Sequence, residues 1–174
     1  GNFVNNNQAL AVMDFFNYPW EEIREGEYII ALDNIQDPGN LGSILRIADW
    51  YGISQLICSQ NTVDLYNPKV ISASMGSFLR IQVHYLDLYA FLREPTNPPA
   101  YAAVLGAKNL HQLNFSPKGG ILIMGNESKG IGEALKKLPL EKISIPSFGQ
   151  AESLNVAMAT AVICDNLRRQ IPPS

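Results

Sequence analysis

Six apolar runs of four or five residues recur along the chain, and segments with the 3.6-residue period of helices separate them. Short apolar runs that alternate with helical segments predict an α/β domain with a mostly parallel sheet. Most of the runs are apolar throughout rather than at alternate positions, so we expect helices on both faces of the sheet. The expected strands span residues 28–32, 55–58, 81–85, 101–105, 121–125 and 142–145, and the expected helices span 41–51, 68–74, 86–93, 132–137 and 153–169.

Composition favours one folded domain over a disordered or membrane-embedded chain. Of the 174 residues, 47% are hydrophobic and 17% are charged, which is enough to build a core. No apolar run approaches the ~20 residues of a membrane span. The first residues, "GNFVNNNQALAVMDFF", lack the basic and apolar regions of a signal peptide, so we do not expect one. They also begin without Met, so we expect a piece of a longer protein.

The cysteines and histidines offer no metal site. Cys58 and Cys164 lie far apart in apolar surroundings, so we expect two buried free thiols in a reducing compartment. His84 lies in an expected strand and His111 in an expected loop, and we interpret both as structural. The net charge of −3 argues against a strongly basic nucleic-acid-binding protein.

Ligands of parallel α/β sheets bind beyond the carboxyl ends of the strands, so the loops there hold the candidate functional residues. In the first loop, "LDNIQDPGNLGSILR", Gly42 leaves room either for a ligand at the backbone or for close packing. Asn40 is either a turn or cap residue or a functional one. Arg46 lies off the buried stripe of the next helix. It is either paired with Asp49 in solvent or turned toward a ligand.

The second loop, "ILIMGNESKGIG", leads from a buried strand into Gly125, Asn126 and Glu127. Its glycines fit neither the dinucleotide fingerprint nor the P-loop pattern, which excludes a nicotinamide or nucleoside-triphosphate site. Glu127 is either a solvated side chain or the partner of a cation across a cleft.

The third stretch, "KISIPSFGQAESLNVAMATAVICDNLRRQ", ends a strand at Pro146 and starts a helix near Ser153. The helix is apolar nearly all round, so we expect it to be buried on every side, in a subunit interface as well as in the core. Ser153 and Asn155 are polar residues in its first turn, where we expect burial. Ser153 is either the N-cap of the helix or a group that meets a ligand.

Taken in order, these stretches resemble the three motifs of the SpoU (TrmH-like) family of RNA ribose 2′-O-methyltransferases, in the SPOUT superfamily. The matching residues are "DNIQDPGNLGSILRIADWYGI", "ILIMGNESKGI" and "IPSFGQAESLNVAMATAVICDNL", and the resemblance extends from Leu32 to the C-terminus. It implies a parallel sheet with a C-terminal deep trefoil knot, which periodicity alone would not suggest. It also implies an obligate homodimer, in agreement with the apolar last helix.

The resemblance implies an S-adenosylmethionine-dependent enzyme, without a metal, that methylates a ribose 2′-OH in tRNA or rRNA. The implied cofactor-binding residues are Leu105, Gly106, Ala107, Met124, Gly125, Asn126, Ile145, Pro146, Ser153, Leu154 and Asn155. Arg46 would approach the 2′-OH and its phosphate and stabilise the developing alkoxide. Asn40 would position Arg46 or the ribose, and Glu127 would orient Arg46 by a salt bridge. Ser153 and Asn155 would shape the cofactor and ribose pocket.

By the same resemblance, residues 27–174 form the SPOUT catalytic domain of a cytoplasmic protein. Residues 1–26 form a lead-in, which we interpret as the remnant of a linker to a missing RNA-binding domain. The alternative function is a non-catalytic dimeric RNA- or cofactor-binding relative of the same fold. A binding module has no need of all five implied catalytic residues, so their presence favours the enzyme.

Overall fold

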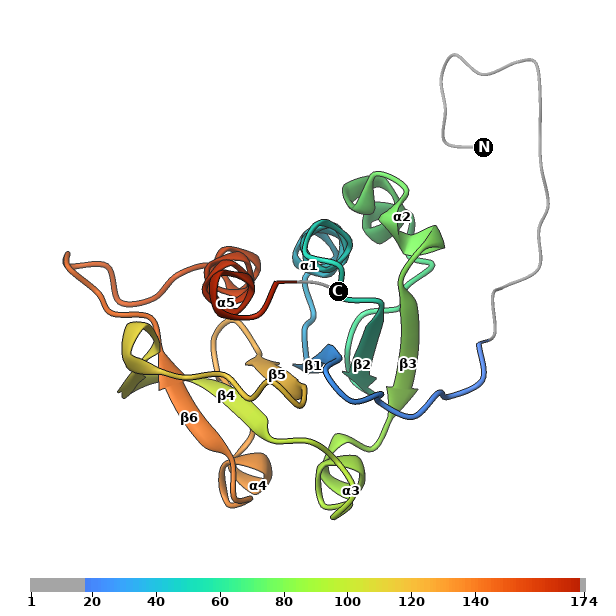
Figure 1. Ribbon diagram of the computed structural model, residues 1–174. Helices are drawn as coiled ribbons and strands as arrows, with labels where there is room; N and C mark the ends of the chain where they lie inside the picture. Colours follow the sequence, from blue (N-terminus) through green and yellow to red (C-terminus); the bar gives the residue numbers. More distant parts are fainter. Residues whose placement is uncertain (1–17, 173–174) are drawn as a thin grey trace, which may run out of the picture.

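The computed structural model describes residues 18–172, which form a six-stranded sheet whose neighbouring strands are all parallel. The strands lie in the order β3-β2-β1-β5-β4-β6. Helices α1, α2 and α5 cover one face, and α3 and α4 cover the other (Figure 1). The expected parallel α/β sheet with helices on both faces is therefore confirmed. The strands are β1 (Tyr28–Asp33), β2 (Gln55–Ser59), β3 (Gln82–Leu86), β4 (Ala100–Asn109), β5 (Gly120–Gly125) and β6 (Glu141–Ser144). The helices are α1 (Pro38–Trp50), α2 (Pro68–Ser74), α3 (Leu88–Leu92), α4 (Glu133–Lys136) and α5 (Val156–Gln170), with short 3₁₀ helices η1 (Ser77–Leu79) and η2 (Leu110–Gln112).

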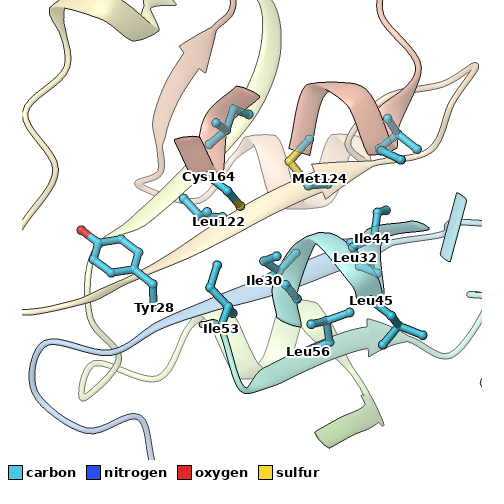
Figure 2. Close-up of a cluster of buried hydrophobic side chains, with 14 of the residues drawn as sticks. Tyr28, Ile30, Leu32, Ile44, Leu45, Ile53, Leu56, Leu122, Met124 and Cys164 are labelled. Atoms are coloured by element: carbon cyan, nitrogen blue, oxygen red, sulfur yellow. The ribbon is translucent and has the colours of Figure 1, made fainter. Parts of the chain in front are cut away.

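The main hydrophobic core lies between the central strands and the helices α1 and α5. Figure 2 shows side chains of β1, β2 and β5 meeting those of the two helices. A buried Ile or Leu contributes roughly 1.5–3 kcal/mol, so this cluster supplies much of the driving force for folding. The labelled side chains are Tyr28, Ile30, Leu32, Ile44, Leu45, Ile53, Leu56, Leu122, Met124 and Cys164.

The two cysteines are buried free thiols, as expected. Burial raises the pKa of the Cys58 thiol, and it raises the pKa of the Cys164 thiol to about 12. Both thiols therefore stay protonated at neutral pH and behave as small hydrophobic side chains.

Gly42 serves close packing between α1 and α2. A Cβ at this position would lie 2.5 Å from Ala73 Cβ and 2.8 Å from the Val70 carbonyl oxygen. Side chains essentially never approach that closely, so Gly42 brings the two helices together. The packing alternative is therefore the correct one for this glycine.

The expected start of α5 is wrong, and burial of the helix on every side, which we expected to include a subunit interface, stays a prediction. The helix begins at Val156 rather than near Ser153, and its N-cap is Asn155. Ser153 and Asn155 are exposed, and the outer side of α5 carries the exposed apolar residues Met158 and Val162. Within a single chain, α5 is thus buried on one face, and its other face is partly apolar.

Across residues 18–172, no helix combines the length and the apolarity that a membrane crossing requires.

The described part of the lead-in packs on the sheet domain, along its β3 edge. The Trp20 ring meets His84 and Phe91 edge to face, with ring centroids 5.3 Å apart in both pairs. Ile23 packs against the cluster on the α3 and α4 side of the sheet. His84 thus has a structural contact, and burial lowers the pKa of its imidazole, which favours the neutral form.

We expect Trp20→Ala to lower the free energy of unfolding by about 1–3 kcal/mol, because it removes two edge-to-face ring contacts. The control is Trp50→Ala at the end of α1. Trp50 is 84% exposed, so its loss should change stability by less than about 0.5 kcal/mol. Urea unfolding followed by far-ultraviolet circular dichroism measures both. Equal midpoints for the two variants would contradict a stabilising role for the lead-in.

Candidate functional site

A chain of side-chain hydrogen bonds joins the three motif-bearing segments at the carboxyl edge of the sheet. The Asn40 amide donates to Glu127 Oε1 at 2.9 Å, and the Asn155 amide donates to Asn40 Oδ1 at 2.8 Å. Glu127 follows β5, Asn40 lies in the first turn of α1, and Asn155 precedes α5. Strand order reverses between β1 and β5, and loops that diverge at such a point form the usual ligand site of an open α/β sheet.

Local structure explains why Asn40 can bridge two segments. Asp37 is the N-cap of α1, and its Oδ1 accepts a hydrogen bond from the Asn40 backbone at 2.8 Å. Pro38 follows as the first helical residue, where its missing N–H costs nothing. The cap is thus complete without the Asn40 side chain, which is free to bind Glu127 and Asn155.

Asn155 uses both ends of its carboxamide. Its Oδ1 accepts hydrogen bonds from the backbone of Ala157 at 2.9 Å and of Met158 at 3.3 Å, which caps α5. Its amide donates to Asn40. One residue therefore both starts α5 and ties the helix to α1.

Asn126 shapes the turn that carries Glu127. Its Oδ1 accepts from the Ser128 backbone, the Ser128 hydroxyl and the Lys129 backbone, at 3.0–3.1 Å. Its amide donates to the Asn34 carbonyl at 2.8 Å, and its backbone exchanges two hydrogen bonds with Gly130. Because its polar groups are committed within the protein, the role of Asn126 that the structure supports is to build this turn.

Beside the hydrogen-bonded chain lies a cleft of about 700 Å³. It is bordered by the middle of β4, by the ends of β5 and β6, by the turn after β5, by the loop before α5 and by the inner face of α5. Of the expected cofactor-binding residues, those that line it are Leu105, Met124, Gly125, Asn126, Ile145, Pro146, Ser153 and Leu154.

Gly106, Ala107 and Asn155 do not line the cleft. Gly106 and Ala107 lie outside the cleft lining because β4 bulges there. The strand pairs with β6 through Ala103 and again through Lys108. Gly106 has a positive φ of 71° within the bulge, and its backbone donates to Ser144 Oγ at 3.2 Å. The bulge returns β4 to β6 and leaves Leu105 at the cleft.

Arg46 is exposed on α1 and does not line the cleft of its own chain. Asp49, its expected partner under the solvent interpretation, is instead bound by Arg80 at 2.6 Å and by the Ser77 hydroxyl at 2.7 Å. The Arg80 hydrogen bonds lower the pKa of the Asp49 carboxyl. Within this one chain, Glu127 accepts a hydrogen bond from Asn40, and the expected salt bridge from Glu127 to Arg46 stays a prediction for a site shared between two chains. Among the described ion pairs, none involves Arg46.

Two residues of the first loop were missed in the sequence. Asp33 Oδ2 accepts a hydrogen bond from the Gly132 backbone at 2.7 Å, which ties the end of β1 to the segment after β5. Asn34 has a positive φ of 60°. The signal was the Asp-Asn pair directly after a buried strand, because both residue types bind nearby backbone groups and tolerate this conformation. Within residues 18–172, no three His, Cys, Asp or Glu side chains are grouped as metal ligands would be.

Fold and site together define an α/β protein with a ligand-sized cleft beside a polar chain built from three loops. The model of the SpoU rRNA Methylase family matches residues 27–165. The chain therefore belongs to this family.

Named relatives act on both rRNA and tRNA. The 23S rRNA (guanosine(2553)-2'-O)-methyltransferase RlmP of Bacillus subtilis is 32% identical over 152 residues, which cover 86% of this chain and 61% of RlmP. The tRNA (guanosine(18)-2'-O)-methyltransferase of Thermus thermophilus is 28% identical over 151 residues, covering 84% of this chain and 77% of that enzyme.

A solved structure agrees with this fold. The AdoMet-bound rRNA methyltransferase from Sinorhizobium meliloti matches with a TM-score of 0.80 at 33% identity, covering 86% of this chain and 59% of that one. This chain therefore spans about three fifths of the length of RlmP and of the Sinorhizobium enzyme.

We expect Asn155→Ala to lower the free energy of unfolding by about 1 kcal/mol or more, because it removes the N-cap of α5. Asn155→Ser is the matched variant: serine caps helices well but is too short to reach Asn40. Its stability should stay within about 0.5 kcal/mol of the original chain. Chemical denaturation measures both, and equal losses for Ala and Ser would show that the link to Asn40, rather than the cap, carries the stability.

Proposed function

We propose that this chain transfers a methyl group from S-adenosylmethionine to a ribose 2′-OH in rRNA or tRNA. The observation that carries the proposal is the hydrogen-bonded chain Glu127–Asn40–Asn155 beside the cleft. Residues from three distant segments meet there, as expected for a built site rather than for three separate turns. Membership of the family and its named relatives support the same activity.

The cleft fits the proposed cofactor in size and chemistry. Its volume of about 700 Å³ lies within the roughly 300–1,000 Å³ of small-molecule sites. Buried Met124 and Ile143 offer an apolar wall. At Gly125, a Cβ would lie 2.3 Å from the backbone of Gly130 and Ile131, so this glycine lets the turn after β5 pack closely at the edge of the cleft. Leu154 and Ser153 would hold the cofactor from the loop before α5. When bound, S-adenosylmethionine supplies a methyl group on a positively charged sulfur.

The chain's own task in such a reaction is to prepare the 2′-OH. A free hydroxyl is a poor nucleophile, and a guanidinium near it stabilises the alkoxide as the proton leaves. Arg46 would take this role and would also hold the adjacent phosphate through two parallel hydrogen bonds. A phosphate oxygen or a water would accept the proton, because arginine stays charged.

Asn40 would position the ribose, since its side chain lies between Glu127 and Asn155. Glu127 would fix the orientation of the Asn40 amide by accepting its hydrogen bond. Asn155 would hold α5 against this pair, and Ser153 would border the cofactor and ribose.

We also propose that two copies of the chain form the site. Arg46 does not line the cleft of its own chain, so it would face the cleft of a second copy. The exposed apolar residues Met158 and Val162 on α5 would lie in the shared interface. Residues 27–174 would be the catalytic unit, with the segment before α5 forming the trefoil knot that the family resemblance implies.

Calorimetry with S-adenosylmethionine tests the cleft. We expect saturable binding by the original chain and more than about tenfold weaker binding by Leu154→Arg, whose bulky charged side chain would fill the cleft. Trp50→Ala is the control, because Trp50 does not line the cleft. A folded chain that gives no heat of binding would contradict the enzyme and leave a non-catalytic relative.

Methyl transfer to RNA tests Arg46. We expect Arg46→Ala to lower the transfer of labelled methyl to in vitro transcripts of 23S rRNA and tRNA by at least about a hundredfold, while cofactor binding stays unchanged. Mixing Arg46→Ala with Leu154→Arg then tests the shared site. If Arg46 acts across the interface, random mixed dimers should regain about a quarter of the original activity, because half of the dimers hold one intact site. A mixture without activity would place Arg46 and its cleft in one chain.

A further inference from the structure

A second set of hydrogen bonds supports the site from the end of β2. Besides the hydrogen bond from Asn40 to Glu127, the turn that carries Glu127 contacts the first loop through the Asn126 amide, which donates to the Asn34 carbonyl at 2.8 Å. The position of Asn34 therefore helps to set the position of this turn and of Glu127.

Asn34 is held in an unusual conformation. Its φ of 60° lies in the left-handed region, which costs a residue with a side chain about 1 kcal/mol or more unless neighbours hold it there. Its backbone is held on two sides. The N–H donates to Ser59 Oγ at 2.8 Å, and the carbonyl accepts from Asn126.

Ser59 is itself held by Thr62. The two hydroxyl oxygens lie 3.2 Å apart, and the Thr62 hydroxyl donates to the Leu32 carbonyl at 3.4 Å. A hydroxyl has one proton to donate, so a single direction satisfies all contacts. The Asn34 N–H donates to Ser59, Ser59 donates to Thr62, and Thr62 donates to Leu32. Thr62 is only 6% exposed, so its hydroxyl depends on these partners.

We propose that Ser59 and Thr62 are positioning residues for the proposed reaction. Neither lines the cleft, so neither meets the cofactor directly. They hold Asn34 in its left-handed conformation, Asn34 holds Asn126, and the Asn126 turn aims Glu127 at Asn40. This inference rests on the proposed methyl transfer, although the contacts themselves can be tested without it.

The test compares Ser59→Ala with Ser59→Thr, which keeps the hydroxyl, and with Thr62→Val. Ser72→Ala, at an exposed position of α2, is the control. We expect Ser59→Ala and Thr62→Val each to lower kcat for methyl transfer to the 23S rRNA and tRNA transcripts by about tenfold. The Kd of S-adenosylmethionine should stay within about twofold, because neither Ser59 nor Thr62 lines the cleft and only the turn after β5 would shift. Ser59→Thr should restore kcat.

Nuclear magnetic resonance provides a readout that is independent of activity. In ¹H–¹⁵N spectra, the side-chain amide signals of Asn40 and Asn155 should shift in Ser59→Ala and return toward their original positions in Ser59→Thr. Unmoved signals would overturn the positioning role. An unchanged kcat with a lower melting temperature would do the same, by showing a stabilising role alone. If the original chain transfers no methyl group to either RNA, the proposed function fails, while the amide signals still decide whether Ser59 positions Asn40.

Discussion

The parallel direction of all the strands in the sheet is the constraint on which the site depends. It brings every carboxyl end to one edge, and the reversal of strand order between β1 and β5 separates the loops there. Asn40 then joins the loops that the sheet places side by side. It binds Glu127, 87 positions away, and Asn155, 115 positions away. One carboxamide joins the turn after β5, the start of α1 and the start of α5.

The two carboxylates that were candidate partners of Arg46 bind other groups of the chain, so the Arg46 guanidinium stays available for a ligand. Glu127 accepts from a neutral amide, and Asp49 is bound by Arg80, so neither carboxylate binds Arg46 within the chain. An arginine already paired with a carboxylate would have to break that pair before it could bind a phosphate. The exposed Arg46 has no such cost, which suits the role proposed for it on RNA.

Much of the fold could be predicted because strands and helices depend on local patterns. Each expected strand and helix exists, and α2 has the expected bounds. The start of α5 was missed because Ser153 and Asn155 are both good N-cap residues. The hydrogen bond from the Asn155 amide to Asn40, which the sequence does not show, favours Asn155 as the cap. The full length of β4 was also missed, because its bulge is defined by pairing with β6.

The sequence by itself determined the parallel α/β fold, the buried thiols and the three motif-bearing loops, since these follow from apolar periodicity and from residue types at fixed spacings. Only the tertiary structure decided that Glu127 binds Asn40 within the chain, that Asn126 is committed to its own turn, and that Gly106 and Ala107 do not line the cleft. The physical reason is that a side-chain hydrogen bond requires its partners to lie within about 3 Å at a suitable angle. Strand order and helix packing set such distances between residues far apart in the chain, and spacing in the sequence does not.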